Sequence, residues 1–246
     1  MQTISINFQV PKGWHELSDK QLRYVYQLIA SNFTSDEIKT LCLLHWSDTK
    51  VLGKQKNGSY ALKKGKHIFY VLPKSLAEIL PFLAWLDNVP SVPVRISKIN
   101  RRPALPADFS EVPFETYIIC DNLYQGYLVT QNEELLDQLG STLYGKEIDF
   151  KPYERVSIFY WFASLKEWMS HKYPDFFQPM ESTNGGNLLR APSMNVEAAM
   201  NAQIRALTKG DVTKESEVLA LDTHRALVEL DAQAREYKEI KDKTSK

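Results

Sequence analysis

The residues that could do chemistry are few, and the histidines come first. The chain holds five of them: His15, His45, His67, His171 and His224. None lies three or four residues from another, and no pair of cysteines accompanies them, whereas metal sites usually take ligands from such close spacings. We therefore predict no metal site. We interpret His45, on an apolar helical pattern, as a hydrogen-bonded core residue.

One carboxylate, Asp121, stands in the apolar segment "IICDNLY". A buried charge is costly unless it is paired. Asp121 could be a catalytic acid, but a structural role is preferred, either as an anchor for Arg155 or at the edge of a helix. No Gly-x-Ser-x-Gly, P-loop or dinucleotide fingerprint occurs. We therefore predict no catalytic or cofactor-binding residues and no cofactor, and a non-enzymatic chain. A site assembled from scattered residues stays the third hypothesis.

A basic hairpin is the most conspicuous surface feature of the sequence. Six lysines lie between Lys50 and Lys66, and no acidic residue lies between Thr49 and Tyr70. Two arginines follow in a proline-rich loop, "NRRPALPADF". The candidate residues for binding a polyanion or an acidic partner are Lys54, Lys56, Lys63, Lys64, Lys66, Arg101 and Arg102.

The hairpin has three possible explanations. Basic strands with interleaved aromatic residues could follow a nucleic-acid backbone and stack bases, aided by Arg95 and Lys98. They could instead bind an acidic protein surface, including one on another copy of the chain. The lysines could also only protect an exposed strand from pairing with other chains. The sequence does not decide between these alternatives.

The chain has no net charge, but its charge is unevenly distributed. Residues 1–105 carry 15 Lys or Arg against 7 Asp or Glu, whereas residues 106–155 carry 3 against 10, a net charge of −7. Such segregation can steer association. The two segments could also face each other within one fold. With 43% hydrophobic and 24% charged residues, the 246-residue chain has an ordinary globular composition.

The two cysteines, Cys42 and Cys120, lie in apolar helical patterns. We interpret them as buried thiols in a reducing compartment. The N-terminus lacks the pattern of a signal peptide, and the longest apolar run is about half of what a bilayer requires. We expect a location in the cytoplasm of a host cell, or in a virion, and no membrane partner.

The pattern predicts a mainly α fold with some β structure. Residues 4–10 alternate like a strand, and capping boxes open helices at Ser18, Thr34 and Ser75. Asn57-Gly58 predicts a type I′ turn in a three-stranded meander over about 49–72, and Pro81 predicts a break in the third helix. "VPVRISKI" predicts another strand. Helices follow from 113, and near the end Asn195 and Thr213 are predicted to cap a helical pair.

The C-terminal run "MNAQIRALTKGDVTKESEVLALDTHRALVELDAQAREYKEIKD" resembles uncharacterised proteins encoded among the tail-morphogenesis genes of Bacteroidales prophages. "DNLYQGYL" and "FYWFASLKEW" extend the resemblance over most of the chain. The helix–"TKGD"–helix layout also looks like the C-terminal part of some tail-assembly chaperones, which hold the tape measure before the tube polymerises. The resemblance implies no catalytic residue.

These observations lead to one organisation and one preferred function. We predict a globular helical domain with the meander over 1–176, a linker or long loop over 177–194 and a helical hairpin over 195–246. We expect a phage-type structural or tail-assembly protein acting through protein contacts, with other tail or assembly proteins, or further copies, as partners. The alternative is a nucleic-acid-binding accessory protein. An apolar stripe that the first helix of the pair is too short to cover predicts a contact site at Leu227, Leu230, Ala234 and Tyr237. Its partner could be the globular part of the same chain, another copy or a different tail component.

Overall fold

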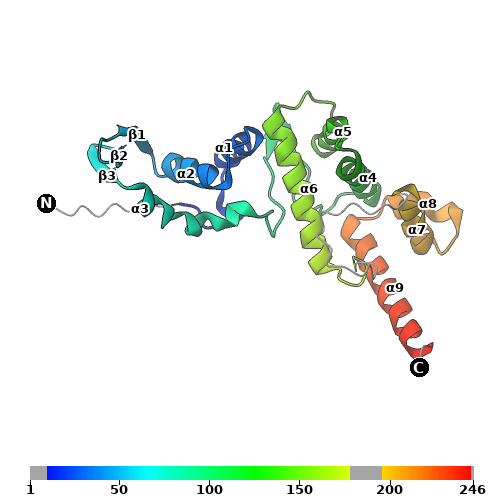
Figure 1. Ribbon diagram of the computed structural model, residues 1–246. Coiled ribbons are helices and arrows are strands. Elements are labelled where there is room, and N and C mark those ends of the chain that lie inside the picture. Colours follow the sequence, from blue (N-terminus) through cyan, green and yellow to red (C-terminus); the bar gives the residue numbers. More distant parts are fainter. Residues whose placement is uncertain (1–9, 178–195, 245–246) are drawn as a thin grey trace. The chain divides into compact units, whose positions relative to one another are not determined.

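The chain forms two compact units, Met1–Pro90 and Ser91–Lys246. The structure, a computed structural model, describes residues 10–177 and 196–244 (Figure 1). As the sequence predicted, the fold is mainly helical with a small antiparallel sheet. No helix in these two ranges is long and apolar enough to cross a membrane.

The units divide the chain differently from the sequence prediction. The boundary at residue 90 falls inside the predicted 1–176 domain, and the C-terminal helices belong to the same unit as residues 91–177. Most of the predicted linker, and most of the predicted strand over residues 4–10, lie outside the described residues.

Unit 1 begins with helices whose ends the sequence predicted well. It contains η1 (Trp14–Glu16), α1 (Asp19–Ala30), α2 (Ser35–Trp46), β1 (Thr49–Lys54), β2 (Tyr60–Lys64), β3 (His67–Val71), α3 (Pro73–Ala77) and η2 (Leu80–Asp87). The capping boxes of Ser18 with Gln21 and of Thr34 with Glu37 are both complete. Each box satisfies backbone N–H groups that a helix start leaves without partners.

The meander is an antiparallel sheet in the order β1-β2-β3. A bulge between Val51 and Gly53 shifts the register of β1 against β2. The predicted type I′ turn is wrong. Such a turn needs a positive φ at both Asn57 and Gly58, and only Gly58 has one, at +82°. Asn57 instead accepts hydrogen bonds from the backbone N–H and the hydroxyl of Ser59. The turn is therefore a wider loop that ends in a left-handed glycine.

The segment after the meander is split, as Pro81 predicted, but its cap is different. The chain forms the short helix α3 and then the 3-10 helix η2. The predicted capping box at Ser75 is wrong: α3 starts at Pro73, and its N-cap is Leu72. Proline is favoured in a first helical turn because that turn needs no N–H donor there.

Trp14 is buried in the core of unit 1 and contacts several of its elements. The Trp14 indole N–H donates to the carbonyl oxygens of Trp85 and Asn88, at 3.0 and 3.1 Å. The Trp14 ring also stacks on Tyr26, with centroids 5.8 Å apart. Lys39 of α2 forms a salt bridge with Asp87 at the end of η2. These contacts hold α1, α2 and η2 together and so position the meander that follows α2.

Unit 2 is built around one long helix. It contains β4 (Lys98–Ile99), β5 (Arg102–Pro103), α4 (Phe114–Thr130), α5 (Glu133–Tyr144), α6 (Pro152–Lys172), α7 (Val196–Thr208), η3 (Val212–Lys214), α8 (Glu215–Leu219) and α9 (Thr223–Thr244). The helix α6 carries Trp161 and Phe162, which are fully buried, and α4 contributes Tyr117 and Tyr124. Aromatic burial of this kind dominates the energetics of a core.

The predicted strand "VPVRISKI" is mostly irregular chain. Only Lys98 and Ile99 pair, with Arg102 and Pro103. A side-chain hydrogen bond helps to fix the position of this segment: the Tyr144 hydroxyl donates to the Ile96 carbonyl at 2.8 Å. A two-residue ladder replaces the strand because the partner β5 is equally short.

The C-terminal helices pack on α4 as part of unit 2. The Phe114 N–H donates to the Leu221 carbonyl at 2.8 Å, and the Thr223 N–H donates to the Val112 carbonyl at 2.9 Å. Buried Asp231 of α9 accepts the backbone N–H groups of Asp175 and Phe176. These bonds join segments more than fifty residues apart in sequence.

The predicted helical pair is also interrupted. Its predicted cap Asn195 lies outside the described residues, and Gly210 ends the first helix with a φ of +81°. The predicted cap Thr213 is wrong, because Asp211 accepts the Thr213 N–H and the chain then forms η3, α8 and α9. The break before Thr223 lets its N–H and hydroxyl both donate to Val112.

Candidate functional site

The more exposed face of the meander is the strongest candidate for a functional surface. Paired residues of neighbouring strands lie on the same face of a sheet. The register therefore places Lys50, Lys63 and Ile68 in one row across the three strands. The next row holds Gly53, Ala61 and Tyr70. The opposite face carries Leu62, which is 1% exposed, together with Val51, Lys54 and Lys64. Ala61 is also buried, so the exposed side chains of the meander lie on both faces around a buried centre.

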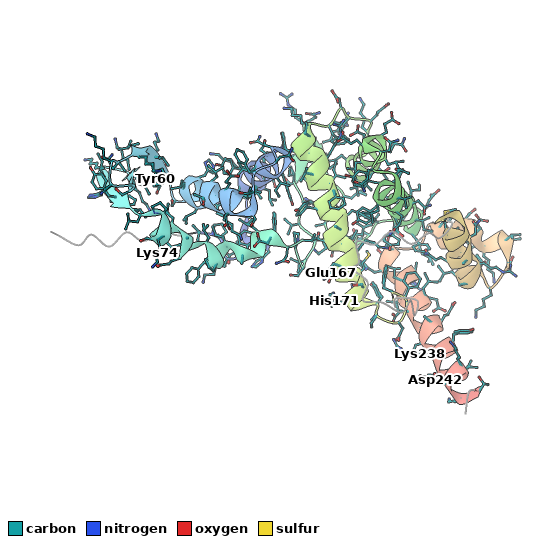
Figure 2. The ribbon with its side chains drawn as sticks, in the orientation of Figure 1. Tyr60, Lys74, Glu167, His171, Lys238 and Asp242 are labelled. Carbon is teal, nitrogen blue, oxygen red and sulfur yellow. The ribbon has the colours of Figure 1, made fainter. Side chains whose placement is uncertain are left out.

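This part of the chain is strongly basic. Residues 49–77 contain seven lysines and no acidic residue. Lys50 and Lys63 are directly paired, an arrangement that is destabilising for like charges. The Lys54 ammonium lies 5.9 Å from the centroid of the Tyr60 ring. Figure 2 labels Tyr60 in the meander and Lys74 at the start of α3.

Large apolar side chains are exposed among these lysines. Six in the meander and the helices that follow are more than half exposed: Val51, Leu52, Ile68, Tyr70, Leu72 and Phe82. Single exposed apolar residues are normal, but a group of them usually marks a contact site. We call this group, with the lysines of residues 49–77, the meander surface. The sequence indicated the aromatic residue Tyr70 of this surface but not the exposed aliphatic ones, of which Ile68 and Leu72 belong to the continuous apolar run "IFYVL".

The structure brings together only part of the predicted basic site. Lys54, Lys56, Lys63 and Lys66 are exposed in the meander, and Lys64 is half-buried. Arg101 and Arg102 are exposed at the β4–β5 turn, but this turn belongs to unit 2. The lysines are therefore a site of unit 1 alone.

In the first half of the predicted contact site on the last helix, the partner is the rest of unit 2 itself. Leu227 is 0% exposed and Leu230 is 4% exposed, because α9 packs on α4 and α7. Ala234 is half-buried and Tyr237 is exposed. Figure 2 shows Lys238 and Asp242 farther along α9, toward its C-terminal end.

Asp121 is paired, but not with the predicted partner. Its carboxylate lies 2.8 Å from the Lys166 ammonium, and Lys166 also lies 3.4 Å from the Tyr117 hydroxyl. Arg155 instead holds Asp137 through two hydrogen bonds, at 2.7 and 2.8 Å. Burial by itself would lower the pKa of Lys166, but Asp121 and Tyr117 outweigh it and leave that pKa raised. The pair joins α4 to α6, which is the structural role that the sequence favoured for Asp121.

Two of the five histidines, His45 and His224, make contacts that hold neighbouring segments together. His45 is exposed, which contradicts the predicted core position, and its ring stacks on Tyr24 at 3.9 Å. His224 hydrogen-bonds at both ring nitrogens, to the Tyr173 hydroxyl at 2.8 Å and to the Asp108 carbonyl at 2.7 Å. No group of three or more metal-ligating side chains occurs within residues 10–177 and 196–244.

Both cysteines are free and buried. Burial raises the pKa of the Cys42 thiol to about 12 and also raises the pKa of Cys120, where Asp121 adds to the effect. A thiol with a raised pKa is a poor nucleophile, because the thiolate is the reactive form. The predicted role as small buried hydrophobic residues fits this environment.

Comparisons with known proteins returned no match, whether with protein-family models, with curated proteins or with solved structures.

Proposed function

We propose that this chain is a non-enzymatic, phage-type structural or tail-assembly protein that acts through protein contacts. The sequence resemblance to prophage tail-morphogenesis proteins supports the phage context. The observation that carries the contact function is the meander surface, where exposed apolar side chains lie among lysines without any acidic residue. The partner is another component of the same assembly.

The mixture of side chains favours a protein partner. Ile68, Leu72 and Phe82 are each more than half exposed, and their burial releases about 25 cal/mol per Å² of apolar area. Lysines depend on long, flexible stems and are depleted at the centres of protein interfaces. The apolar side chains therefore form the centre of the contact, and the lysines form a rim that attracts an acidic partner.

Nucleic acid is the second candidate, and one observation favours it. Lys50 and Lys63 are directly paired, and exposed Tyr70 lies in the neighbouring row beside Gly53 and Ala61. Two neighbouring lysines can bind a phosphate group of the backbone. A tyrosine ring beside small residues is accessible to a base, which can stack on it.

The test uses cells that naturally encode the chain. Tail particles are purified after induction of the prophage and analysed by mass spectrometry. We expect the unmodified chain to be present in the particles or their assembly intermediates. The double variant Ile68→Ser, Tyr70→Ser should be lost from them, while Lys20→Glu, an exposed change outside the meander surface, should be retained. Absence of the unmodified chain from every such fraction would contradict the proposal.

A polarisation assay decides the second candidate. Purified chain is titrated into labelled single-stranded and double-stranded DNA and RNA at low salt. Binding that weakens steeply with salt and on Lys63→Gln would favour nucleic acid. No binding at tens of micromolar protein would remove that candidate.

A further inference from the structure

We propose that the meander surface binds a second copy of this chain, at the acidic region formed by α5 and the loop after it. The inference rests on the proposed function, in that it takes the meander surface to be a protein-contact surface. It adds the identity of the partner. The proposal concerns unit 1 of one copy and unit 2 of another.

The two regions carry opposite charges. Residues 49–77 carry seven lysines and no acid, a net charge of +7, whereas α5 and the loop after it, residues 133–151, carry five acids and two lysines, a net charge of −3. Opposed charges steer two surfaces together and suppress association of like surfaces.

The acids of α5 and its following loop border a groove. Its lining includes Asp137, Lys146, Glu147, Ile148 and Asp149. Arg155 neutralises Asp137 through paired hydrogen bonds, but Glu147 and Asp149 are exposed and form no salt bridge with a described residue. Exposed Glu134, near the start of α5, adds a third carboxylate, which accepts a hydrogen bond from the Asn132 side chain at 3.5 Å. The groove thus offers free negative charge beside an apolar side chain, Ile148.

The meander surface complements this arrangement. Directly paired Lys50 and Lys63 repel each other in the free chain, and carboxylates placed against them relieve the repulsion. Ile68 lies in the same row and supplies the apolar contact that Ile148 needs. Burial of the apolar pair contributes a salt-independent part of the affinity, and the charges contribute a salt-dependent part.

The two surfaces are different, so the contact is heterologous. Each copy that binds through its meander surface leaves its own acidic region free for another copy. Such contacts close into a ring or continue as a helical filament. Both are geometries that an assembly protein of a tail could use.

The test is the mass of the purified full chain in solution. Light scattering and sedimentation are measured at about 0.1 M and about 1 M salt, where the Debye length falls from about 10 Å to about 3 Å. We expect multimers that grow with protein concentration at low salt and shrink at high salt. A chain that stays monomeric at low salt up to hundreds of micromolar would overturn the inference.

Charge exchange tests the two surfaces separately. One variant carries Lys50→Glu and Lys63→Glu, and the other carries Glu147→Lys and Asp149→Lys. Each alone should associate much more weakly, because the two changed positions then carry the same charge as the side chains that they meet in the partner copy. Mixing the two variants should restore multimers, because each surface again meets its opposite. Failure of the mixture to associate, with both variants folded by circular dichroism, would overturn the inference.

A matched control carries the same change of charge elsewhere on unit 1. Lys12→Glu with Lys20→Glu alters two exposed lysines outside the meander surface and should still form multimers. A loss of association in this control equal to that of the meander variant would mean that net charge alone is responsible, and would overturn the inference. A chain that is monomeric when pure but retained in tail particles would overturn the second-copy partner and leave the proposed function standing.

Discussion

Asp121 and Lys166 form an ion pair that joins α4 to α6, with 2.8 Å between carboxylate oxygen and ammonium nitrogen. Each side chain is about one-fifth exposed. The pair lies beside Tyr117 and under the ring of Phe177, whose centroid is 4.9 Å from the Lys166 nitrogen. Its charge is therefore balanced within unit 2, and removal of one partner leaves the other charge poorly solvated.

Lys166→Met should lower the free energy of unfolding by about 2 to 3 kcal/mol, somewhat less than for a fully buried pair because solvent reaches part of the site. Urea denaturation at neutral pH measures the change. The double variant Lys166→Met, Asp121→Leu should recover part of the loss, because no uncompensated charge remains. Equal losses in the single and double variants would contradict the buried-charge explanation.

Alkaline pH should destabilise the protein partly through Cys42. Burial raises the pKa of this thiol from 9.0 to about 12 in the folded state. Between these values the unfolded chain loses the proton and the folded chain keeps it. The unfolded state then gains about 1.4 kcal/mol per pH unit for such a group. Below pH 9 the thiol is protonated in both states, so it does not change the pH dependence of the free energy of unfolding.

The measurement is urea denaturation at pH 7.5, 9 and 11, for the unmodified chain and for Cys42→Ala. We expect the unmodified chain to lose more stability between pH 9 and 11 than the variant does. Tyr124, whose pKa burial raises to about 12, is present in both proteins and contributes equally to each. Parallel losses in the two proteins would show that Cys42 does not titrate in this range.

Two helical glycines should respond in opposite ways to alanine. A Cβ at Gly140 of α5 would lie 2.5 Å from the Ile158 side chain and 2.7 Å from Phe150, both in the packed core. Overpacking of this kind costs roughly 1 to 3 kcal/mol. A Cβ at Gly126 of α4 would meet only the tip of Leu135, at 3.1 Å, and alanine gains up to about 1 kcal/mol of helix propensity.

Thermal melts of Gly140→Ala and Gly126→Ala measure this difference. We expect a clearly lower melting temperature for the first and an equal or higher one for the second. A stabilised Gly140→Ala variant would show that α5 and α6 are packed less closely than the structure has them.

The two halves of α9 should differ in their importance for folding. Leu230 is buried under α4, and Leu230→Ala should cost about 2 to 5 kcal/mol. Tyr237 is 72% exposed, and Tyr237→Ala should change stability by less than about 0.5 kcal/mol. Denaturant titration of both variants checks this. If both variants changed the free energy of unfolding by a similarly small amount, Leu230 would not be part of the core.

Lys50→Glu should stabilise the fold while it weakens association. The change converts a like-charge pair with Lys63 into an attractive one, worth roughly 0.2 to 1 kcal/mol across strands. Thermal melts and light scattering of the same preparation measure both effects. A variant with lower stability would mean that the Lys50 stem packs in the sheet, and unchanged association would count against the meander surface.

Local signals in the sequence predicted the local structure well. The boxes at Ser18 and Thr34 and the meander are short-range features, in which residues three or four apart satisfy each other. The helix start predicted at Ser75 was wrong because Pro73, two residues earlier, is a stronger signal for the first turn of a helix. Asn57-Gly58 predicted a turn correctly but not its type, because Asn57 uses its side chain to bond Ser59.

Contacts between residues far apart in the chain could not be predicted from the sequence. The periodicity of α9 shows an apolar stripe but not what covers it, so the sequence left the partner of Leu227 and Leu230 open, whereas the structure buries both within unit 2. Asp121 was correctly identified as needing a partner, yet the choice between Arg155 and Lys166 depends on how α4, α5 and α6 are arranged. The lysines of the meander surface could be predicted from the sequence. Its exposed apolar side chains could not, because their exposure depends on which side chains the rest of unit 1 covers.

The backbone bonds between Val112 and Thr223 have a consequence for how the protein is made. They close a loop of 111 residues, and such a closure is entropically costly and slow compared with the formation of single helices. During synthesis, α4, α5 and α6 leave the ribosome before α9 exists. Until the C-terminal helices arrive, the part of α4 that packs against α7, α8 and α9 has no cover. Unit 2 is therefore most vulnerable to aggregation or capture by chaperones in that interval, and unit 1 can complete its own folding first.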